Sequence, residues 1–120
     1  MNFFLPKFSW LQAFHSQADT ENLSRFELEA RLEADIARGC LRQVRKTLDR
    51  LQRDLFQAEL LLLADRCLQR GKFVDAFWLA TRLRQRSEQR RLLEDIVRAA
   101  ARGDDVRTAR WTALYLERLT

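Results

Sequence analysis

The densest group of charged side chains lies between residues 82 and 91. Five arginines fall in this stretch, offset only by Glu88: Arg82, Arg84, Arg86, Arg90 and Arg91. Guanidinium groups gathered on one surface can neutralise phosphates or meet the carboxylates of an acidic partner. The competing interpretation is a solvated helix face in a chain that uses arginine where others use lysine, with 19 Arg and 3 Lys.

The charge is unevenly distributed along the chain. Residues 1–60 hold nine basic and nine acidic side chains, whereas residues 61–120 hold thirteen and eight, so the second half supplies the whole net charge of +5. The basic run continues beyond residue 91 with Arg98, Arg102, Arg107 and Arg110. This surface, residues 82–110, is the basis of an alternative function in nucleic-acid binding or regulation. The 17 acidic residues of the chain count against it.

Residues for other chemistry are sparse. His15 is the only histidine, and nothing in the sequence places a second catalytic group beside it. Cys40 and Cys67 lack the spacing of metal ligands, and the three glycines are too isolated to form a phosphate loop. We therefore expect no enzyme activity, no metal and no cofactor, and we expect both thiols to be buried and reduced.

Length and composition favour one all-α domain. The chain has 120 residues with only three Gly and one Pro, whereas Leu, Ala, Arg and Glu are abundant. No apolar run approaches the ~18 residues that span a bilayer. The apolar N-terminus is interrupted by Pro6 and Lys7 and has no basic leader before it. We expect a cytoplasmic protein.

An Arg-Gly motif recurs along the chain. Arg38-Gly39, Arg70-Gly71 and Arg102-Gly103 each end an apolar, helix-like pattern, and their glycines are spaced by 32 residues. A glycine after a basic residue suits a helix end, because glycine adopts the left-handed conformation without strain. A period of this length predicts stacked helical hairpins.

The expected elements follow from this repeat. We predict a short aromatic helix within residues 3–14, a polar linker to residue 23, and a repeat domain over 24–120. Ser24 and Glu27 have capping-box spacing, Asp54 and Ser87 are candidate caps for later helices, and Asp104 or Asp105 caps the last. The six main helices are expected at 24–38, 41–53, 54–70, 73–85, 87–102 and from 104 or 105 to the C-terminus.

An apolar ladder follows each glycine, with steps of three, four and three residues. It predicts the buried stripe of each second helix: Leu41, Val44, Leu48 and Leu51; Phe73, Ala76, Ala80 and Leu83; Val106, Ala109, Ala113 and Leu116. The middle hairpin is apolar nearly all round, as expected for a unit between two others.

The second unit resembles the tetratricopeptide repeat, with Leu60, Leu63, Ala64 and Cys67 before Gly71, and Phe73, Ala76 and Ala80 after it. The first and third units are similar but degenerate. The resemblance implies antiparallel hairpins stacked as a short right-handed superhelix, whose first helices line a concave groove. The groove positions it implies are Phe26, Glu29, Glu33 and Ile36; Ala58, Leu61, Asp65 and Leu68; and Arg90, Leu93, Val97 and Ala100.

An apolar groove with acidic residues at one end suits an amphipathic helix of a partner protein. The resemblance therefore implies an interaction module, a small chaperone or adaptor similar to the bacterial secretion chaperones. Three alternatives stay open: the same residues form the core of a compact bundle, a second copy or residues 3–14 cover the groove, or the aromatic N-terminus binds a membrane surface.

Overall fold

The computed structural model describes residues 23–119, and these form six helices with no strand among them. The short helix predicted within residues 3–14 lies outside the described residues. The helices are α3 (Arg25–Ala37), α4 (Leu41–Leu51), α5 (Gln57–Gln69), α6 (Phe73–Ala80), α7 (Arg86–Arg102) and α8 (Val106–Arg118).

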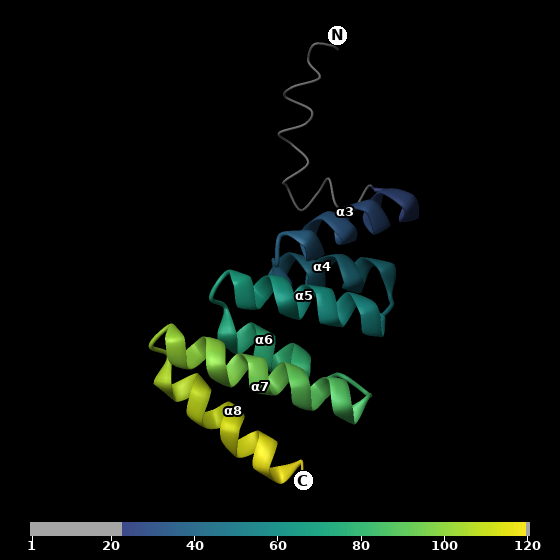
Figure 1. Ribbon diagram of the computed structural model, residues 1–120. Coiled ribbons are helices and arrows are strands. Elements are labelled where there is room, and N and C mark those ends of the chain that lie inside the picture. Colours follow the sequence, from purple (N-terminus) through teal and green to yellow (C-terminus); the bar gives the residue numbers. More distant parts are fainter. Residues whose placement is uncertain (1–22, 120) are drawn as a thin grey trace.

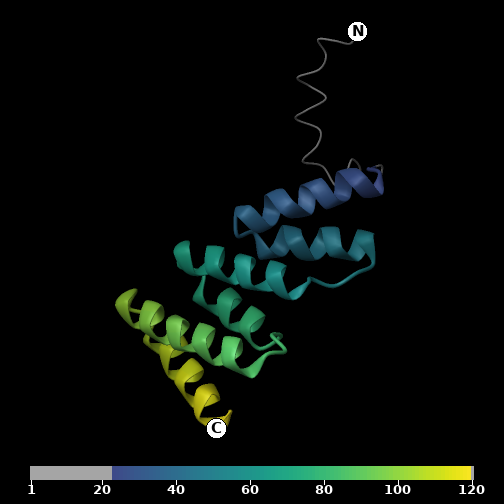
Figure 2. The same ribbon diagram turned by 45° about the vertical axis from the view of Figure 1, so that its right-hand side comes forward.

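The helices pair in chain order into three antiparallel hairpins, α3–α4, α5–α6 and α7–α8, which stack one after another (Figures 1 and 2). This confirms the all-α architecture of stacked hairpins that the 32-residue period predicts.

The same hydrogen-bonded turn ends the first helix of each hairpin. After α3, the N–H groups of Gly39 and Cys40 donate to the carbonyls of Ile36 and Asp35, and equivalent bonds follow α5 and α7. This is the Schellman pattern, which needs one residue in the left-handed conformation. Gly39 and Gly71 supply it at φ +70° and +73°, as predicted.

The prediction for the third glycine is wrong. Gly103 has φ −90° and caps α7, and Asp104 takes the left-handed position at φ 63°. The helix is therefore one residue longer than the repeat implies. A Cβ at Gly103 would lie 3.0 Å from a ring carbon of Phe73. The glycine is thus explained by the close approach of α6 to this turn and not by its backbone conformation.

The predicted N-terminal caps are partly confirmed. The Ser24 hydroxyl accepts from the Glu27 N–H at 3.2 Å while the Glu27 carboxylate accepts from the Ser24 N–H at 2.9 Å, which is the expected capping box. Asp105 caps α8 by accepting from the Thr108 N–H at 3.1 Å. Asp54 does not cap α5, which begins at Gln57.

Helix α6 ends five residues earlier than predicted, at Ala80. The Thr81 hydroxyl donates to the carbonyl of Trp78 at 2.7 Å, and the buried Gln89 amide of α7 donates to the carbonyl of Ala80 at 3.0 Å. These side chains take the place of further helical hydrogen bonds. Leu83 is buried from the turn that follows, so its periodicity extended the predicted helix.

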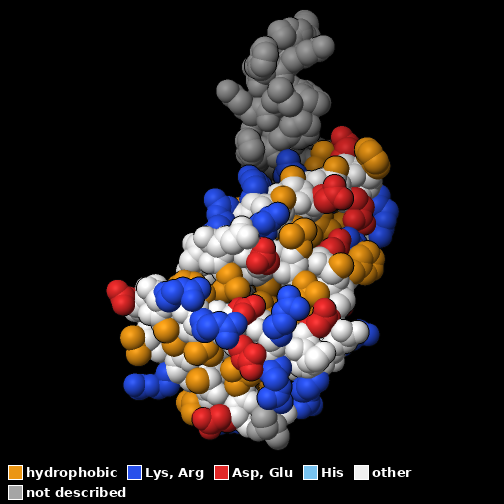
Figure 3. Space-filling view, in the orientation of Figure 1, with side chains coloured by type: hydrophobic (Ala, Val, Ile, Leu, Met, Phe, Trp, Pro, Cys, Tyr) orange, Lys and Arg blue, Asp and Glu red, His pale blue; other side chains and the backbone are white. Residues whose placement is uncertain are grey.

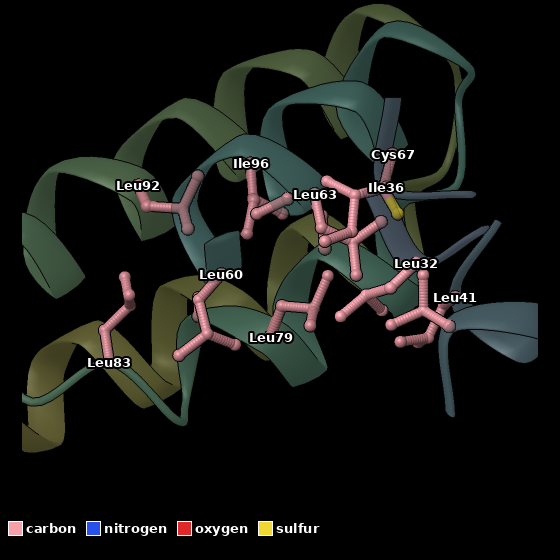
Figure 4. Close-up of a cluster of buried hydrophobic side chains, with 14 of the residues drawn as sticks. Leu32, Ile36, Leu41, Leu60, Leu63, Cys67, Leu79, Leu83, Leu92 and Ile96 are labelled. Carbon is pink, nitrogen blue, oxygen red and sulfur yellow. The ribbon is translucent and has the colours of Figure 1, made fainter. Parts of the chain in front are cut away.

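One hydrophobic core runs through all three hairpins. Leu32 of α3, Leu63 of α5, Leu79 of α6 and Ile96 of α7 are almost fully buried in it (Figure 4). The predicted ladders of the first two units contribute as expected, except that Leu48 and Phe73 are only half-buried. In α8 the ladder is half-buried at best, and Val106 is 62% exposed, because no further helix among residues 23–119 packs on that side.

The two junctions between hairpins are built differently. At the first junction α3 packs closely on α5, whereas at the second α6 packs closely on α7. Neither α4 with α6 nor α5 with α7 is closely packed within the described residues. A hollow therefore opens on the second-helix side of the first junction and on the first-helix side of the second.

The two left-handed glycines should tolerate substitution unequally. Gly71→Ala should cost about 1–2 kcal/mol for the strained backbone alone, because nothing lies within 4 Å of the added Cβ. Gly39→Ala should cost more, since its Cβ would meet the Arg66 backbone at 3.2 Å. Gly71→Val should destabilise more than Gly71→Ala. Urea unfolding followed by circular dichroism measures all three, and a loss below about 0.5 kcal/mol for Gly71→Val would contradict the capping role.

Candidate partner-binding surface

A hollow of about 220 Å³ lies between α5 and α7, and we call it the α5–α7 groove. From α5 it receives three of the predicted groove residues: Leu61, Asp65 and Leu68. Leu61 and Leu68 are half-buried and pack on the edge of the core. The opposite wall is formed by α7 through Glu88, Arg91, Leu92 and Asp95.

The groove carries more negative than positive charge. Among the described residues the lining holds three carboxylates, Asp65, Glu88 and Asp95, and one guanidinium, Arg91. Two of the carboxylates have ion-pair partners outside the lining: Arg66 for Asp65 and Arg98 for Asp95. Glu88 accepts from the Gln57 amide at 3.1 Å, and Asp65 accepts from the Gln69 amide at 3.0 Å. The lining is therefore an apolar strip bordered by acidic side chains that retain accepting capacity. Over the face shown in Figure 3, charges of both signs are interspersed among hydrophobic side chains.

The four groove positions predicted in the first unit do not form part of this hollow. Phe26 is 82% exposed and Glu33 is exposed on α3, but Ile36 is 2% exposed and belongs to the core. The prediction for Ile36 is wrong because α3 packs directly on α5 at the first junction. Glu29 is held by Arg53 and so is already paired within the protein.

Two of the four positions predicted in the third unit are also wrong. Leu93 and Ala100 are fully buried, whereas Arg90 and Val97 are half-buried. In the second unit Ala58 is exposed outside the hollow. The resemblance assigns the groove to the same relative positions in the first helix of every hairpin. A groove between two helices is instead lined by the sides that face each other, and these sides occupy different relative positions in the two helices. The spacing of Glu88, Arg91, Leu92 and Asp95 along one helix face was the signal available in the sequence.

The arginines of residues 82–91 are divided among separate places. Arg82 and Arg84 line the hollow at the first junction, whereas Arg91 lines the α5–α7 groove. Arg86 donates to the carbonyl of Leu119 at 2.7 Å, and Arg90 is half-buried. The five arginines of the predicted basic patch therefore do not line a single hollow.

Arg53 holds the first two hairpins together, and sequence reasoning missed it. Its guanidinium donates to Glu29 of α3 and to Glu59 of α5, with shortest N–O distances of 2.9 Å for both. It also donates to the carbonyl of Asp54 at 2.7 Å and lies 4.4 Å from the centre of the Phe56 ring. The Arg53 side chain is only 14% exposed.

The ion pairs of Arg53 lower the pKa of both carboxylates. For Glu29 the hydrogen bonds from Arg53 are the main cause of the lowered pKa. For Glu59 burial acts to raise the pKa, but the bonds from Arg53 and from the Phe56 N–H together outweigh it. Glu59 also accepts a hydrogen bond from the Phe56 N–H at 2.9 Å, so the same carboxylate caps the N-terminus of α5.

The two cysteines do not form a disulfide. Cys67 is buried beside the carbonyl of Gly39, with its Sγ at 3.7 Å, and burial raises its pKa to about 11. Its thiol is neutral at physiological pH and unreactive. Cys40 is half-buried, so the prediction of two buried thiols is confirmed fully only for Cys67.

In comparisons with known proteins, no family model, characterised protein or solved structure matched this chain. Residues 23–119 contain no group of three or more His, Cys, Asp or Glu side chains arranged to hold a metal ion. None of the helices in that range combines the length and the apolar character needed to cross a membrane.

Acid should weaken the Arg53 bridge. Glu29 and Glu59 have lowered pKa values in the folded protein, so their stabilising contribution is complete above the unfolded value of about 4.3 and is lost as pH falls below it. Arg53→Gln should lower the free energy of unfolding at pH 7 by about 1–3 kcal/mol. The difference in the free energy of unfolding between Arg53→Gln and the unsubstituted protein should become smaller as the pH falls below about 4.3.

Urea unfolding across a pH series measures this effect, with Arg42→Gln of α4 as the control, because Arg42 is exposed and has no ion pair among the described residues. A constant difference between Arg53→Gln and the unsubstituted protein at all pH values would contradict the bridge.

Proposed function

We propose that this protein is an interaction module that binds an amphipathic helix of a partner protein in the α5–α7 groove. The observation that carries the proposal is the pair of half-buried leucines, Leu61 and Leu68, in a hollow that no other helix of residues 23–119 covers. Uncovered apolar surface bordered by charge is typical of a binding site. The two leucines are seven residues apart, about 10 Å along the helix axis.

The charge of the groove selects the partner. Glu88, which has no ion-pair partner within residues 23–119, favours lysine or arginine beside the apolar residues of the bound helix, and Asp65 and Asp95 add to this although each already pairs with an arginine. A partner helix with leucine-like residues seven positions apart and flanking basic residues would match both features. This selectivity is the opposite of what an acidic partner or a nucleic acid requires.

The likeness to tetratricopeptide-like hairpin repeats supports a role as a small chaperone or adaptor. Stacked hairpins with an open first-helix side suit the shielding of an amphipathic segment, as in the secretion chaperones. A second copy of the chain or its own residues 3–14 are the competing occupants of the groove. The nucleic-acid alternative loses support because the arginines of residues 82–91 do not share one hollow.

Three neighbouring leucines of α5 provide a matched test. The probe is a labelled Leu/Lys amphipathic peptide of about 18 residues, long enough to form a helix, with a Leu/Glu peptide for comparison. Leu61→Asp should keep the helical content and weaken Leu/Lys binding by about tenfold or more. Leu62→Asp should bind normally, because Leu62 is 43% exposed and outside the groove. Leu63→Asp should unfold the domain, since Leu63 is fully buried.

Fluorescence anisotropy measures binding and circular dichroism measures folding. The proposal fails if Leu61→Asp unfolds the protein as completely as Leu63→Asp, or if Leu62→Asp weakens binding equally. Deleting residues 1–14 distinguishes the competing occupants: the affinity for the peptide rises if those residues fill the groove. Sedimentation of the full chain reports whether a second copy fills it instead.

A further inference from the structure

The hollow at the first junction is the larger of the two, about 440 Å³, and it lies between α4, the start of α5 and the end of α6. We call it the arginine hollow. Its walls include aliphatic side chains of α4 and α5, among them Leu41, Leu48 and Leu60, and the half-buried indole of Trp78. Arg45, Arg82 and Arg84 also line it, together with Leu55, Phe56 and Gln57, and Asp54 is the only acidic residue that residues 23–119 contribute to this lining.

Two of these arginines are positioned by Trp78. The guanidinium carbon of Arg82 lies 3.9 Å from the centre of the indole ring, and that of Arg45 lies 5.1 Å from it. A guanidinium group that stacks on an aromatic ring keeps the N–H donors at its edge available for a ligand. Neither Arg45 nor Arg82 has an ion-pair partner within residues 23–119.

The hollow thus combines what a carboxylate and an apolar side chain each require. Guanidinium groups that are already held in place lose little side-chain entropy on binding a carboxylate, and the pairing is bidentate where the geometry permits. The aliphatic wall beside them would bury a large apolar side chain. The charge balance, three arginines against one aspartate, is opposite to that of the α5–α7 groove.

We propose that the arginine hollow binds a peptide segment of a partner protein in which an acidic residue is followed closely by a large apolar one. The carboxylate pairs with Arg45 and Arg82, and the apolar side chain packs against Leu41, Leu48 and Trp78. This site is formed by other residues than the α5–α7 groove and does not depend on it. The protein then has two docking surfaces that select partners of opposite charge.

A peptide fits this hollow better than a nucleic acid does. Bases bound to single-strand-binding proteins stack on free aromatic faces, whereas Arg82 and Arg45 already lie over the Trp78 ring, and Arg53 lies over the ring of Phe56, the other aromatic residue of the lining. Asp54 would repel a phosphate chain, and the aliphatic wall offers a sugar–phosphate backbone no hydrogen bond. A single carboxylate meets less repulsion from Asp54 than a chain of phosphates does, and the apolar side chain beside it can pack on the aliphatic wall.

The test uses the full-length protein and the labelled Leu/Glu amphipathic peptide of about 18 residues. Arg82→Glu and Arg45→Glu should each weaken its binding by about tenfold or more, and Arg82→Lys should weaken it less. Arg110→Glu of α8 is the control, because it changes the net charge equally at an exposed position far along the chain from the hollow. Leu61→Asp in the α5–α7 groove should leave Leu/Glu binding unchanged.

Several results would overturn the proposal. It fails if the Leu/Glu peptide shows no saturable binding at about 100 μM, or if Arg110→Glu weakens binding as much as Arg82→Glu does. It also fails if a single-stranded oligonucleotide binds more tightly than the peptide and Arg82→Glu abolishes that binding, which would make the hollow a nucleic-acid site. Circular dichroism of each variant confirms that a loss of binding is not a loss of fold.

Discussion

The bridge from Arg53 to Glu29 and Glu59 is the constraint on which the arrangement of the first two hairpins depends. A single guanidinium, almost removed from solvent, holds the start of α5 against α3 and satisfies both carboxylates. On this side α3 packs closely on α5, whereas α4 and α6 are not closely packed on the other side, where the arginine hollow lies.

The second junction is closed on the opposite side. There α6 packs on α7, the Gln89 amide reaches back to the end of α6, and a glycine at position 103 lets the Phe73 ring approach closely. The first-helix side is left open as the α5–α7 groove. Each junction therefore leaves one apolar hollow partly exposed, and the two hollows differ in charge. We infer that unequal stacking, and not the repeat alone, generates the two hollows.

The local structure of the chain could be predicted from its sequence. The capping box of Ser24 and Glu27, the cap at Asp105, the left-handed turns at Gly39 and Gly71, and the buried ladders of the first two units follow from short-range rules of spacing and conformation. The end of α6 could not be predicted in this way. Leu83 continues the helical spacing of apolar residues, although it lies in the turn after α6 and is buried there. The spacing of apolar residues indicates which side chains are buried, but it does not indicate whether the backbone there is a helix or a turn.

The sequence by itself determined the all-α class and the stacked hairpins, since helical periodicity and the 32-residue repeat are both properties of residue spacing along the chain. Only the tertiary structure decided that Ile36 and Leu93 are core, that Glu29 is paired, and that the arginines of residues 82–91 separate. These outcomes depend on the angle between neighbouring hairpins. That angle is set by long-range contacts such as the one between Arg53 and Glu29, which no repeating pattern records.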